Sequence, residues 1–282
     1  MDQTPVDYAL IDAGGAGRLE RFGAHLVDRP YTAGLSPPRY PDRWPEADLR
    51  FERASGWTGE GVGAARGEWS VELGGLTMEL RPTEAGQVGL FPEHASMLSW
   101  LLERVAARSP GTSVLHLFAY TGLATLALAR SGAAVTHVDA SKAAVAWARR
   151  NAAANGLADR PIRWLTEDVR AFVARERRRG RRYDGLVIDP PSYGHGTSGR
   201  AWRLETDLDG LIADCRTLLE PDGFVLLTAH TEGIGPDELA GRLRRAGRLP
   251  ASAVEAGPLE IEGEDGLRLR LGAFARWDGR TR

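Results

Sequence analysis

The spacing of apolar residues changes character near residue 93. Beyond that point, residues 94–109 carry apolar side chains every three or four positions, which is typical of an amphipathic helix. Short apolar runs then alternate with further stretches of helical spacing. The pattern predicts strands over 113–119, 134–140, 162–168, 183–191 and 224–231, and helices over 121–132, 141–156, 169–180 and 236–247. Residues 204–223 read as a helix followed by a turn.

Strands that alternate with helices pair in parallel through right-handed crossovers. Residues 258–277 read as two further strands around a turn at Glu264, Asp265 and Gly266, which adds an antiparallel edge. The sequence therefore predicts an open α/β domain over residues 93–282.

The first 92 residues lack this alternation of strand and helix patterns. Residues 1–50 contain six prolines and little periodicity, which favours an irregular arm packed on something larger. Residues 68–81 alternate apolar and polar side chains around Gly74 and Gly75, as a two-stranded hairpin does. We therefore expect residues 1–92 to form an irregular and β-rich N-terminal unit.

Composition excludes several classes of protein. The chain is 43% apolar and 26% charged, which is ordinary for a globular protein. Its single cysteine, Cys215, excludes an internal disulfide and a cysteine-based zinc site, and we expect no metal. The N-terminus has no basic start followed by an apolar run, and no stretch approaches the roughly 20 apolar residues that span a bilayer. These features predict a cytoplasmic protein that does not enter membranes.

The formal net charge of −2 indicates no general attraction to nucleic acid. The strongest local candidate is a cluster of six arginines, Arg175, Arg177, Arg178, Arg179, Arg181 and Arg182. This arginine cluster could neutralise several phosphates. It could also complement the carbonyl dipoles at a helix C-terminus. Its place between the third helix and the fourth strand favours the second interpretation.

The loops after the first strands bear on the cofactor, because open α/β sheets bind ligands beyond the carboxyl ends of their strands. The first loop, residues 118–122, has neither the G-x-G-x-x-G pattern nor a phosphate-binding loop, which argues against NAD, FAD and ATP. Asp139 ends the second strand, where a carboxylate accepts from ribose hydroxyls, and Asp168 ends the third, near an adenine amino group. A nucleoside without a diphosphate, recognised by two carboxylates, describes S-adenosylmethionine. Each aspartate alone could instead cap the next helix.

The fourth strand ends in Asp189-Pro190-Pro191-Ser192-Tyr193-Gly194. Two prolines stiffen this turn and would hold the Asp189 carboxylate beside a methyl donor. Such an acceptor orients an amino or ring nitrogen, and Tyr193 would stack a flat substrate. The alternative is a structural turn with a core tyrosine.

The segments LHLFAYTG, VTHVDASKAAVAWARRNAAANGL, EDV and YDGLVIDPPSYGHG together resemble one family of class I S-adenosylmethionine-dependent methyltransferases. It is the family that contains the large-subunit ribosomal RNA methyltransferases I and K. The resemblance covers roughly residues 68–276. It implies a Rossmann-like, seven-stranded, mostly parallel sheet with an antiparallel C-terminal hairpin, and a small N-terminal β-rich unit.

The resemblance also implies roles for individual residues. Phe118, Tyr120 and Gly122 would line the methionine part of the cofactor. Leu90, Phe91 and His94 match a stretch that closes over it. The remaining positions of the predicted cofactor set are Asp139, Ala140, Ser141, Asp168, Val169 and Asp189, and the predicted catalytic set is Asp189, Pro190, Tyr193 and His230.

Cytosine C5 methylation needs a thiolate that activates the ring. Residues 228–233, after the fifth strand, contain no cysteine, and Cys215 lies among apolar neighbours within a predicted helix. Cytosine C5 chemistry is therefore disfavoured. His230 is either a substrate-facing general base or a packing residue. His195 lies in a glycine-rich loop, where it either contacts substrate or is simply exposed, and we favour exposure.

The sequence thus predicts an S-adenosylmethionine-dependent methyltransferase that transfers the methyl group directly to a nitrogen or oxygen. An RNA base is the leading acceptor. A planar small molecule of a biosynthetic pathway is the second, because no RNA-binding signature stands out in the first 67 residues. A non-catalytic, cofactor-binding regulator is the third interpretation, and the intact Asp-Pro-Pro-Ser-Tyr run argues against it. The oligomeric state is left open.

Overall fold

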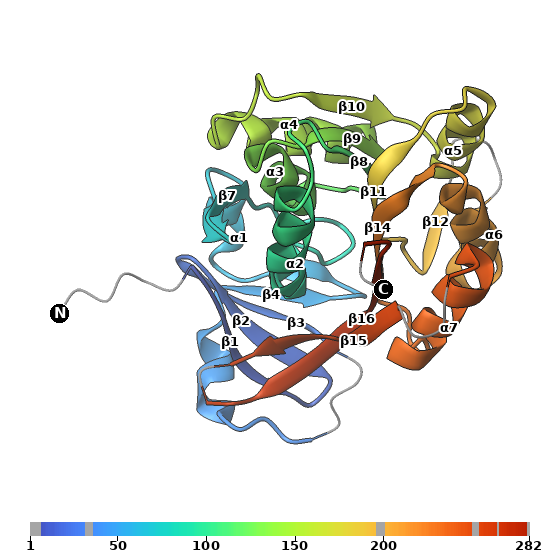
Figure 1. The fold of residues 1–282 in the computed structure, drawn as a ribbon. Helices are drawn as coiled ribbons and strands as arrows, with labels where there is room; N and C mark the ends of the chain where they lie inside the picture. Colours follow the sequence, from blue (N-terminus) through green and yellow to red (C-terminus); the bar gives the residue numbers. More distant parts are fainter. Residues whose placement is uncertain (1–6, 32–35, 196–200, 250–253, 264, 281–282) are drawn as a thin grey trace. The chain divides into compact units, whose positions relative to one another are not determined.

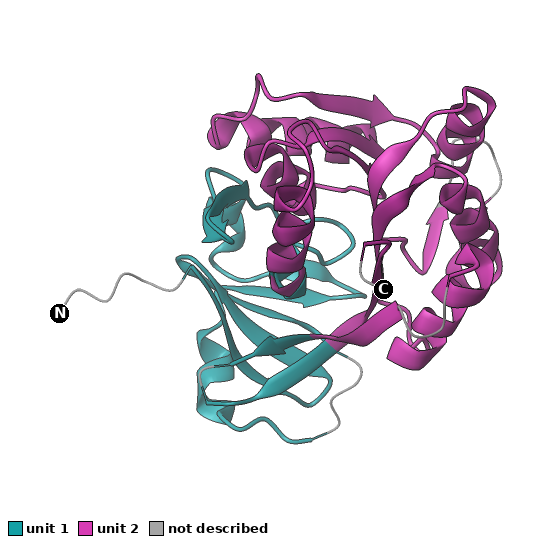
Figure 2. Cartoon of the chain, viewed as in Figure 1, with its two compact units in different colours: residues 1–95, 260–270 teal, residues 96–259, 271–282 magenta. Residues whose placement is uncertain are grey.

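The computed structural model describes residues 7–31, 36–195, 201–249, 254–263 and 265–280, and its elements are drawn in Figure 1. The chain divides into two compact units. The first comprises Met1–Ala95 with Glu260–Arg270, and the second Ser96–Leu259 with Leu271–Arg282 (Figure 2). Within the described ranges, no helix is long and apolar enough to cross a membrane.

The central element is a seven-stranded sheet of order β10-β9-β8-β11-β14-β16-β15. Its first five strands pair in parallel, and β16 pairs antiparallel to β14, so the predicted open α/β sheet is confirmed. The strands are β8 (Ser113–Leu117), β9 (Ala134–Asp139), β10 (Ile162–Thr166), β11 (Tyr183–Ile188), β14 (Leu219–Ala229), β15 (Val254–Glu262) and β16 (Arg268–Asp278). Glu264, in the predicted turn between the last two, lies outside the described residues.

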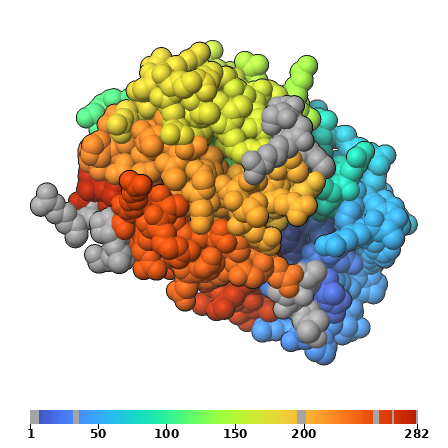
Figure 3. Space-filling view, turned by 90° about the vertical axis from the view of Figure 1, so that its right-hand side faces the viewer, coloured from blue at the N-terminus to red at the C-terminus, as the bar shows by residue number. Residues whose placement is uncertain are grey.

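Helices cover both faces of this sheet. They are α2 (Ala95–Ala106), α3 (Leu123–Arg130), α4 (Lys142–Ala154), α5 (Val169–Arg178), α6 (Leu204–Arg216) and α7 (Pro236–Gly247). Neighbouring residues of one strand enter different cores: Val114 packs in the core with α2 and α3, and Leu115 in the core with α5, α6 and α7. The short apolar runs in the sequence have this cause, because strands buried on both faces need no polar alternation. Figure 3 looks onto α5, α6 and α7, which lie side by side.

The first unit holds a five-stranded sheet of order β1-β2-β3-β4-β5. Its strands are β1 (Tyr8–Gly14), β2 (Gly17–Phe22), β3 (His25–Pro30), β4 (Leu49–Glu52) and β5 (Gly56–Thr58). The expectation of an irregular arm over residues 1–50 was therefore wrong. Gly15 and Ala16 join β1 to β2 with φ of 59° and 69°, the left-handed conformations that a two-residue hairpin turn requires.

Buried charges explain why the sequence pattern concealed these strands. Glu20 is fully buried on β2, and its carboxylate lies 3.2 Å from Arg18 Nε and 2.6 Å from an Arg29 guanidinium nitrogen. The Tyr8 hydroxyl donates to its other oxygen at 3.0 Å. Because charged side chains occupy core positions, the usual alternation of apolar and polar residues is absent over this segment.

Shorter elements complete the chain. The predicted hairpin over 68–81 is confirmed as β6 (Ser70–Leu73) and β7 (Leu76–Glu79). A second antiparallel pair, β12 (Tyr193–His195) with β13 (Ala201–Arg203), was not predicted, and it places His195 in a strand where we expected a loop. The remaining helical turns are η1 (Pro41–Glu46), α1 (Val62–Ala65) and η2 (Pro92–His94).

Candidate active site

Five predicted segments meet at one edge of the seven-stranded sheet. Strands β8, β9, β10, β11 and β14 are mutually parallel, so their carboxyl ends share an edge. The strand order reverses between β8 and β11, and this switch point is where open α/β sheets bind ligands. The segments that follow the five strands carry, in chain order, Phe118–Gly122, Asp139, Asp168, Asp189 and His230.

The loop after β8 has an unusual backbone. Phe118, Tyr120 and Gly122 have φ of 57°, 47° and 92°. Among the described residues only four non-glycine residues have positive φ, and two of them lie in this loop. Such conformations cost about 1–3 kcal/mol each and persist where the surroundings hold them. The side chain of Asn151 provides part of that restraint, because its amide donates to the Thr121 carbonyl at 3.0 Å.

Asp139 provides the rest of the restraint. One carboxylate oxygen accepts from the Tyr120 N–H at 2.9 Å and the other from the Ser141 N–H at 2.8 Å. Burial raises the pKa of Asp139, the two N–H donors lower it, and the charge of Asp189 raises it further. Each oxygen keeps a second lone pair, so the carboxylate can still accept from ribose hydroxyls. Asp139 is not the cap of α4, since Ser141 is.

Asp168 does cap the following helix. It accepts from the Ala171 N–H at 3.0 Å and is 7% exposed. Its other oxygen lies 3.8 Å from an Arg170 guanidinium nitrogen. The capping alternative is therefore correct for Asp168, and its role toward adenine stays a prediction. Of the neighbouring predicted residues, Ala140 is half-buried, Ser141 exposed and Val169 buried.

Asp189 and His230 form the polar pair at the centre of this edge. Asp189 Oδ1 lies 3.6 Å from His230 Nε2 and accepts from the Thr228 hydroxyl at 2.5 Å. His230 Nδ1 lies 2.9 Å from the Leu271 carbonyl. Because a carbonyl only accepts, Nδ1 carries the proton, and in the neutral ring Nε2 is the acceptor that faces Asp189. We refer to Asp189 and His230 as the acid–histidine pair.

Two contacts that the sequence did not reveal hold the Asp-Pro-Pro-Ser-Tyr loop. Trp202 on β13 donates its indole N–H to the Pro191 carbonyl at 2.7 Å, and its ring centroid lies 5.1 Å from that of Phe118. The Ser192 and Thr231 hydroxyls are 2.7 Å apart. Trp202 thus links the first and fourth loops. Trp202 follows a glycine-rich run and belongs to no recognisable motif, so the sequence could not predict these contacts.

Tyr193 is 51% exposed, so the alternative of a core tyrosine is wrong. The guanidinium carbon of Arg203 lies 6.0 Å from its ring centroid. Pro190, the other predicted catalytic-loop residue, is buried.

Leu90, Phe91 and His94 belong to the first unit. Leu90 is 2% exposed, and the rings of Phe91 and His94 lie 5.8 Å apart around η2. Their predicted role in closing over the cofactor stays a prediction.

The arginine cluster lies at the end of α5 and before β11, which is the sheet edge opposite the acid–histidine pair. Several of its members are already paired. Arg175 contacts Glu167, Arg177 contacts Asp214, and Arg179 lies 3.3 Å from Glu176. These pairs favour the interpretation of a charged helix terminus.

Cys215 is 1% exposed within α6, and burial raises the pKa of its thiol. A buried thiol of raised pKa is a poor nucleophile, so this thiol is unsuited to attacking a cytosine ring.

A sequence profile of the S-adenosylmethionine-dependent methyltransferases matches residues 38–257. The chain belongs to this family. The cofactor of the methyltransferase is therefore S-adenosylmethionine, and two observations fit it: a half-buried carboxylate at the end of β9 and a left-handed loop after β8.

Relatives and solved structures agree with this assignment. The methyltransferase is 30% identical over 225 residues to the ribosomal RNA large subunit methyltransferase K/L of Alteromonas mediterranea, covering 79% of this chain and 30% of the relative. It is 36% identical over 146 residues to the protein of that name from Ectopseudomonas mendocina, covering 51% and 19%. The chain thus spans less than a third of these relatives. The crystal structure of a SAM-dependent methyltransferase from Agrobacterium tumefaciens aligns with a TM-score of 0.89 and 38% identity, covering 97% of this chain and 91% of that one.

Proposed function

We propose that this methyltransferase transfers the methyl group of S-adenosylmethionine to a nitrogen or oxygen of an RNA base. The acid–histidine pair carries the proposal, because it places a proton acceptor and a carboxylate 3.6 Å apart at the cofactor edge of the sheet. The names of the curated relatives support an RNA base as the acceptor class. The buried thiol of Cys215 supports nitrogen or oxygen over cytosine C5.

The bound cofactor would supply an electrophilic methyl group. Phe118, Tyr120 and Gly122 would line its methionine part, and Asp139 would accept from its ribose hydroxyls. Asp189 would orient the acceptor through its N–H or O–H group. His230 Nε2 would take the proton that the acceptor loses, and Asp189 would stabilise the imidazolium that forms. Tyr193, half of whose surface is exposed, would stack the base.

A planar small-molecule acceptor is the second candidate. The observation that favours it is the position of the arginine cluster, which lies at the edge opposite the acid–histidine pair and has three of its six members in ion pairs. The same residues would act on either acceptor, so only the substrate differs.

An assay with radiolabelled S-adenosylmethionine distinguishes an RNA acceptor from a small-molecule acceptor. We expect label to enter in vitro transcribed large-subunit ribosomal RNA, and nuclease digestion to return it on a nucleoside methylated at nitrogen or oxygen. Label that enters only a small-molecule fraction of a cell extract would replace RNA with the second candidate. Label on C5 of cytidine would contradict the proposed chemistry.

Replacing Asp139 with alanine should raise the Kd for S-adenosylmethionine about 100-fold, since hydrogen bonds to a charged group contribute about 1.5–3 kcal/mol each. The variant loses the ribose acceptor and the restraint on the Tyr120 N–H together. Isothermal titration calorimetry measures the change. Asp184→Ala is the matched control, because Asp184 also accepts from a backbone N–H, that of Ser113 at 2.8 Å, but at the opposite edge of the sheet. Equal affinities in the two variants would remove Asp139 from the cofactor site.

A further inference from the structure

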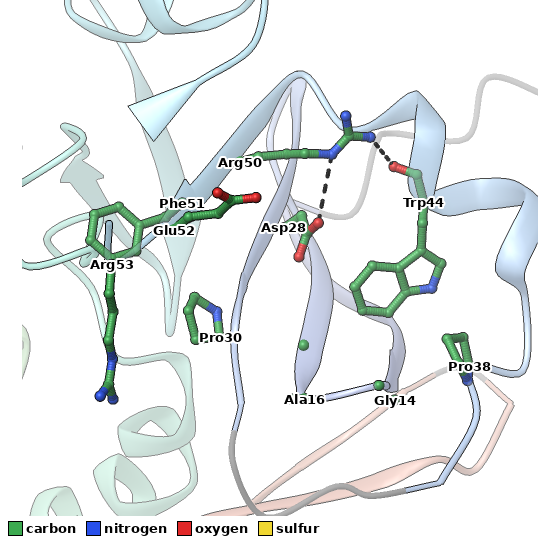
Figure 4. A pocket seen from close by; sticks show the side chains of 12 residues that line it. Gly14, Ala16, Asp28, Pro30, Pro38, Trp44, Arg50, Phe51, Glu52 and Arg53 are labelled. Atoms are coloured by element: carbon green, nitrogen blue, oxygen red, sulfur yellow. Dashed lines mark hydrogen bonds and ion pairs between the residues drawn. The ribbon is translucent and has the colours of Figure 1, made fainter. Parts of the chain in front are cut away.

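The first unit contains a pocket of its own, with a volume of about 480 Å³ (Figure 4). Pockets for small ligands span about 300–1,000 Å³, so it has room for one nucleotide. Its lining combines the β1–β2 turn, Asp28 on β3, an aromatic ring from η1, and the start and end of β4. Its lining residues include Asp28, Trp44, Arg50, Glu52 and Arg53.

Trp44 is a fixed aromatic wall of this pocket. Its indole N–H donates to Asp12 Oδ2 at 2.9 Å. Asp12 is fully buried and also accepts from the backbone N–H groups of Ala13, Arg39 and Tyr40. The ring edge packs so closely on Gly17 that a Cβ there would lie 2.8 Å from it. In Figure 4 the ring lies between Asp28 and Pro38. A ring held in this way offers a face for stacking at little entropic cost.

The carboxylate of Asp28 is held beside this ring. Its Oδ2 lies 3.6 Å from Arg50 Nε, and Arg50 also donates to the Trp44 carbonyl at 2.5 Å. Arg50 is therefore committed to positioning the wall and the acid. Burial raises the pKa of Asp28, Arg50 lowers it, and the nearby carboxylate of Glu52 raises it. Asp28 is thus a partly desolvated acceptor, which favours a ligand with N–H donors.

Arg53, unlike Arg50, contacts neither the Asp28 carboxylate nor the Trp44 carbonyl. It is exposed, and within the described residues no acidic group pairs with it. In Figure 4 its side chain extends on the opposite side of Pro30 from Asp28 and Trp44. The pocket therefore separates a stacking wall with an acceptor from a free guanidinium.

We propose that this pocket binds one unpaired nucleotide of an RNA, with the base stacked on Trp44, its amino-bearing edge at Asp28, and its phosphate at Arg53. Aromatic side chains stack unpaired bases, carboxylates accept from base amino groups, and a guanidinium binds phosphate. The inference rests on the proposed function in one respect only, that the nucleotide belongs to the RNA acceptor.

Equilibrium dialysis of the full chain with the four nucleoside 5′-monophosphates tests the pocket directly. GMP, CMP and AMP, which carry an amino group, are expected to bind about tenfold tighter than UMP, which has none. Asp28→Leu should remove that preference, because a leucine side chain of similar size has no acceptor. Arg53→Glu and Trp44→Phe should weaken GMP binding about tenfold and about threefold, respectively. Arg66→Glu is the matched control, because Arg66 is an exposed arginine of the same unit that does not line the pocket.

The outcomes separate this inference from the proposed function. Binding of UMP as tight as that of GMP, or an Arg53→Glu variant that binds like Arg66→Glu, overturns the pocket. If the pocket is overturned, Arg53→Glu should also leave the KM for RNA in the methyl-transfer assay unchanged. The proposed methyl transfer to RNA is not contradicted by that result. If mononucleotides bind with the expected preferences but no label enters RNA, the pocket stands and the proposed acceptor is wrong.

Discussion

Asp189→Asn is expected to lower the kcat of methyl transfer about 100- to 10,000-fold, the range over which a positioned acid or base contributes. The variant keeps an oxygen that accepts from the Thr228 hydroxyl, so the loop geometry is preserved. It loses the negative charge that orients the acceptor and stabilises a protonated His230. Asp189 also belongs to the predicted cofactor set, but Asp139 keeps both of its N–H donors in this variant. The Kd for S-adenosylmethionine should therefore change less than about threefold. Single-turnover transfer and calorimetry on the same samples measure the two quantities.

Two further variants sharpen this result. Asp214→Asn removes an exposed carboxylate of α6 that pairs with Arg177, and its kcat should equal that of the unaltered protein. His230→Gln keeps a polar side chain but removes the proposed base, and should lower kcat within the same range. Normal transfer by Asp189→Asn would exclude Asp189 from the mechanism.

Glu20→Gln is expected to lower the free energy of unfolding of the first unit by about 3–5 kcal/mol, the usual cost of breaking a buried ion pair from one side. The substitution removes the carboxylate that pairs with the buried guanidiniums of both Arg18 and Arg29. Urea titration followed by tryptophan fluorescence measures the loss. Glu46→Gln breaks an exposed pair with Arg43, and should cost less than about 1 kcal/mol. A similar, small cost for both variants would show that the buried network contributes little.

The same network predicts a dependence on pH. Burial raises the pKa of Glu20, but Arg18 and Arg29 outweigh it and hold the pKa below its ordinary value of 4.5. A carboxyl group with a lowered folded-state pKa stabilises the fold above its unfolded pKa. That contribution is lost as the pH falls below 4.5 and through the folded-state value. The difference in Tm between the unaltered protein and Glu20→Gln should therefore shrink as the pH is lowered over this range.

The sequence predicted the second unit far better than the first. Strands β8, β9 and β11 are short apolar runs because both of their faces are covered, and such runs are visible without any tertiary information. In the first unit, Asp12, Glu20 and Arg29 are buried within strands, which removed the alternation on which strand prediction depends. The division into residues 1–92 and 93–282 stays a prediction.

The candidate site was predictable to the extent that it follows from strand ends. Asp139 ends its strand, and Asp168, Asp189 and His230 each follow theirs. A parallel sheet brings such positions to one edge. Their individual roles were not predictable in this way. Asp168 caps α5, whereas Asp139 accepts from the Tyr120 N–H and restrains that backbone. The two aspartates occupy similar positions in the sequence, so their different roles could not be predicted from it.

By itself, the sequence determined the alternation of strands and helices that builds the parallel sheet, the edge at which the loops collect, and the absence of a thiol suited to attacking cytosine. These follow from local periodicity, strand direction and residue count. Only the tertiary structure decided which partners each polar group has. Asp189 contacts Thr228 across 39 residues, and His230 contacts Leu271 across 41. Pairings over such distances depend on how the strands pack, and no local pattern in the chain encodes them.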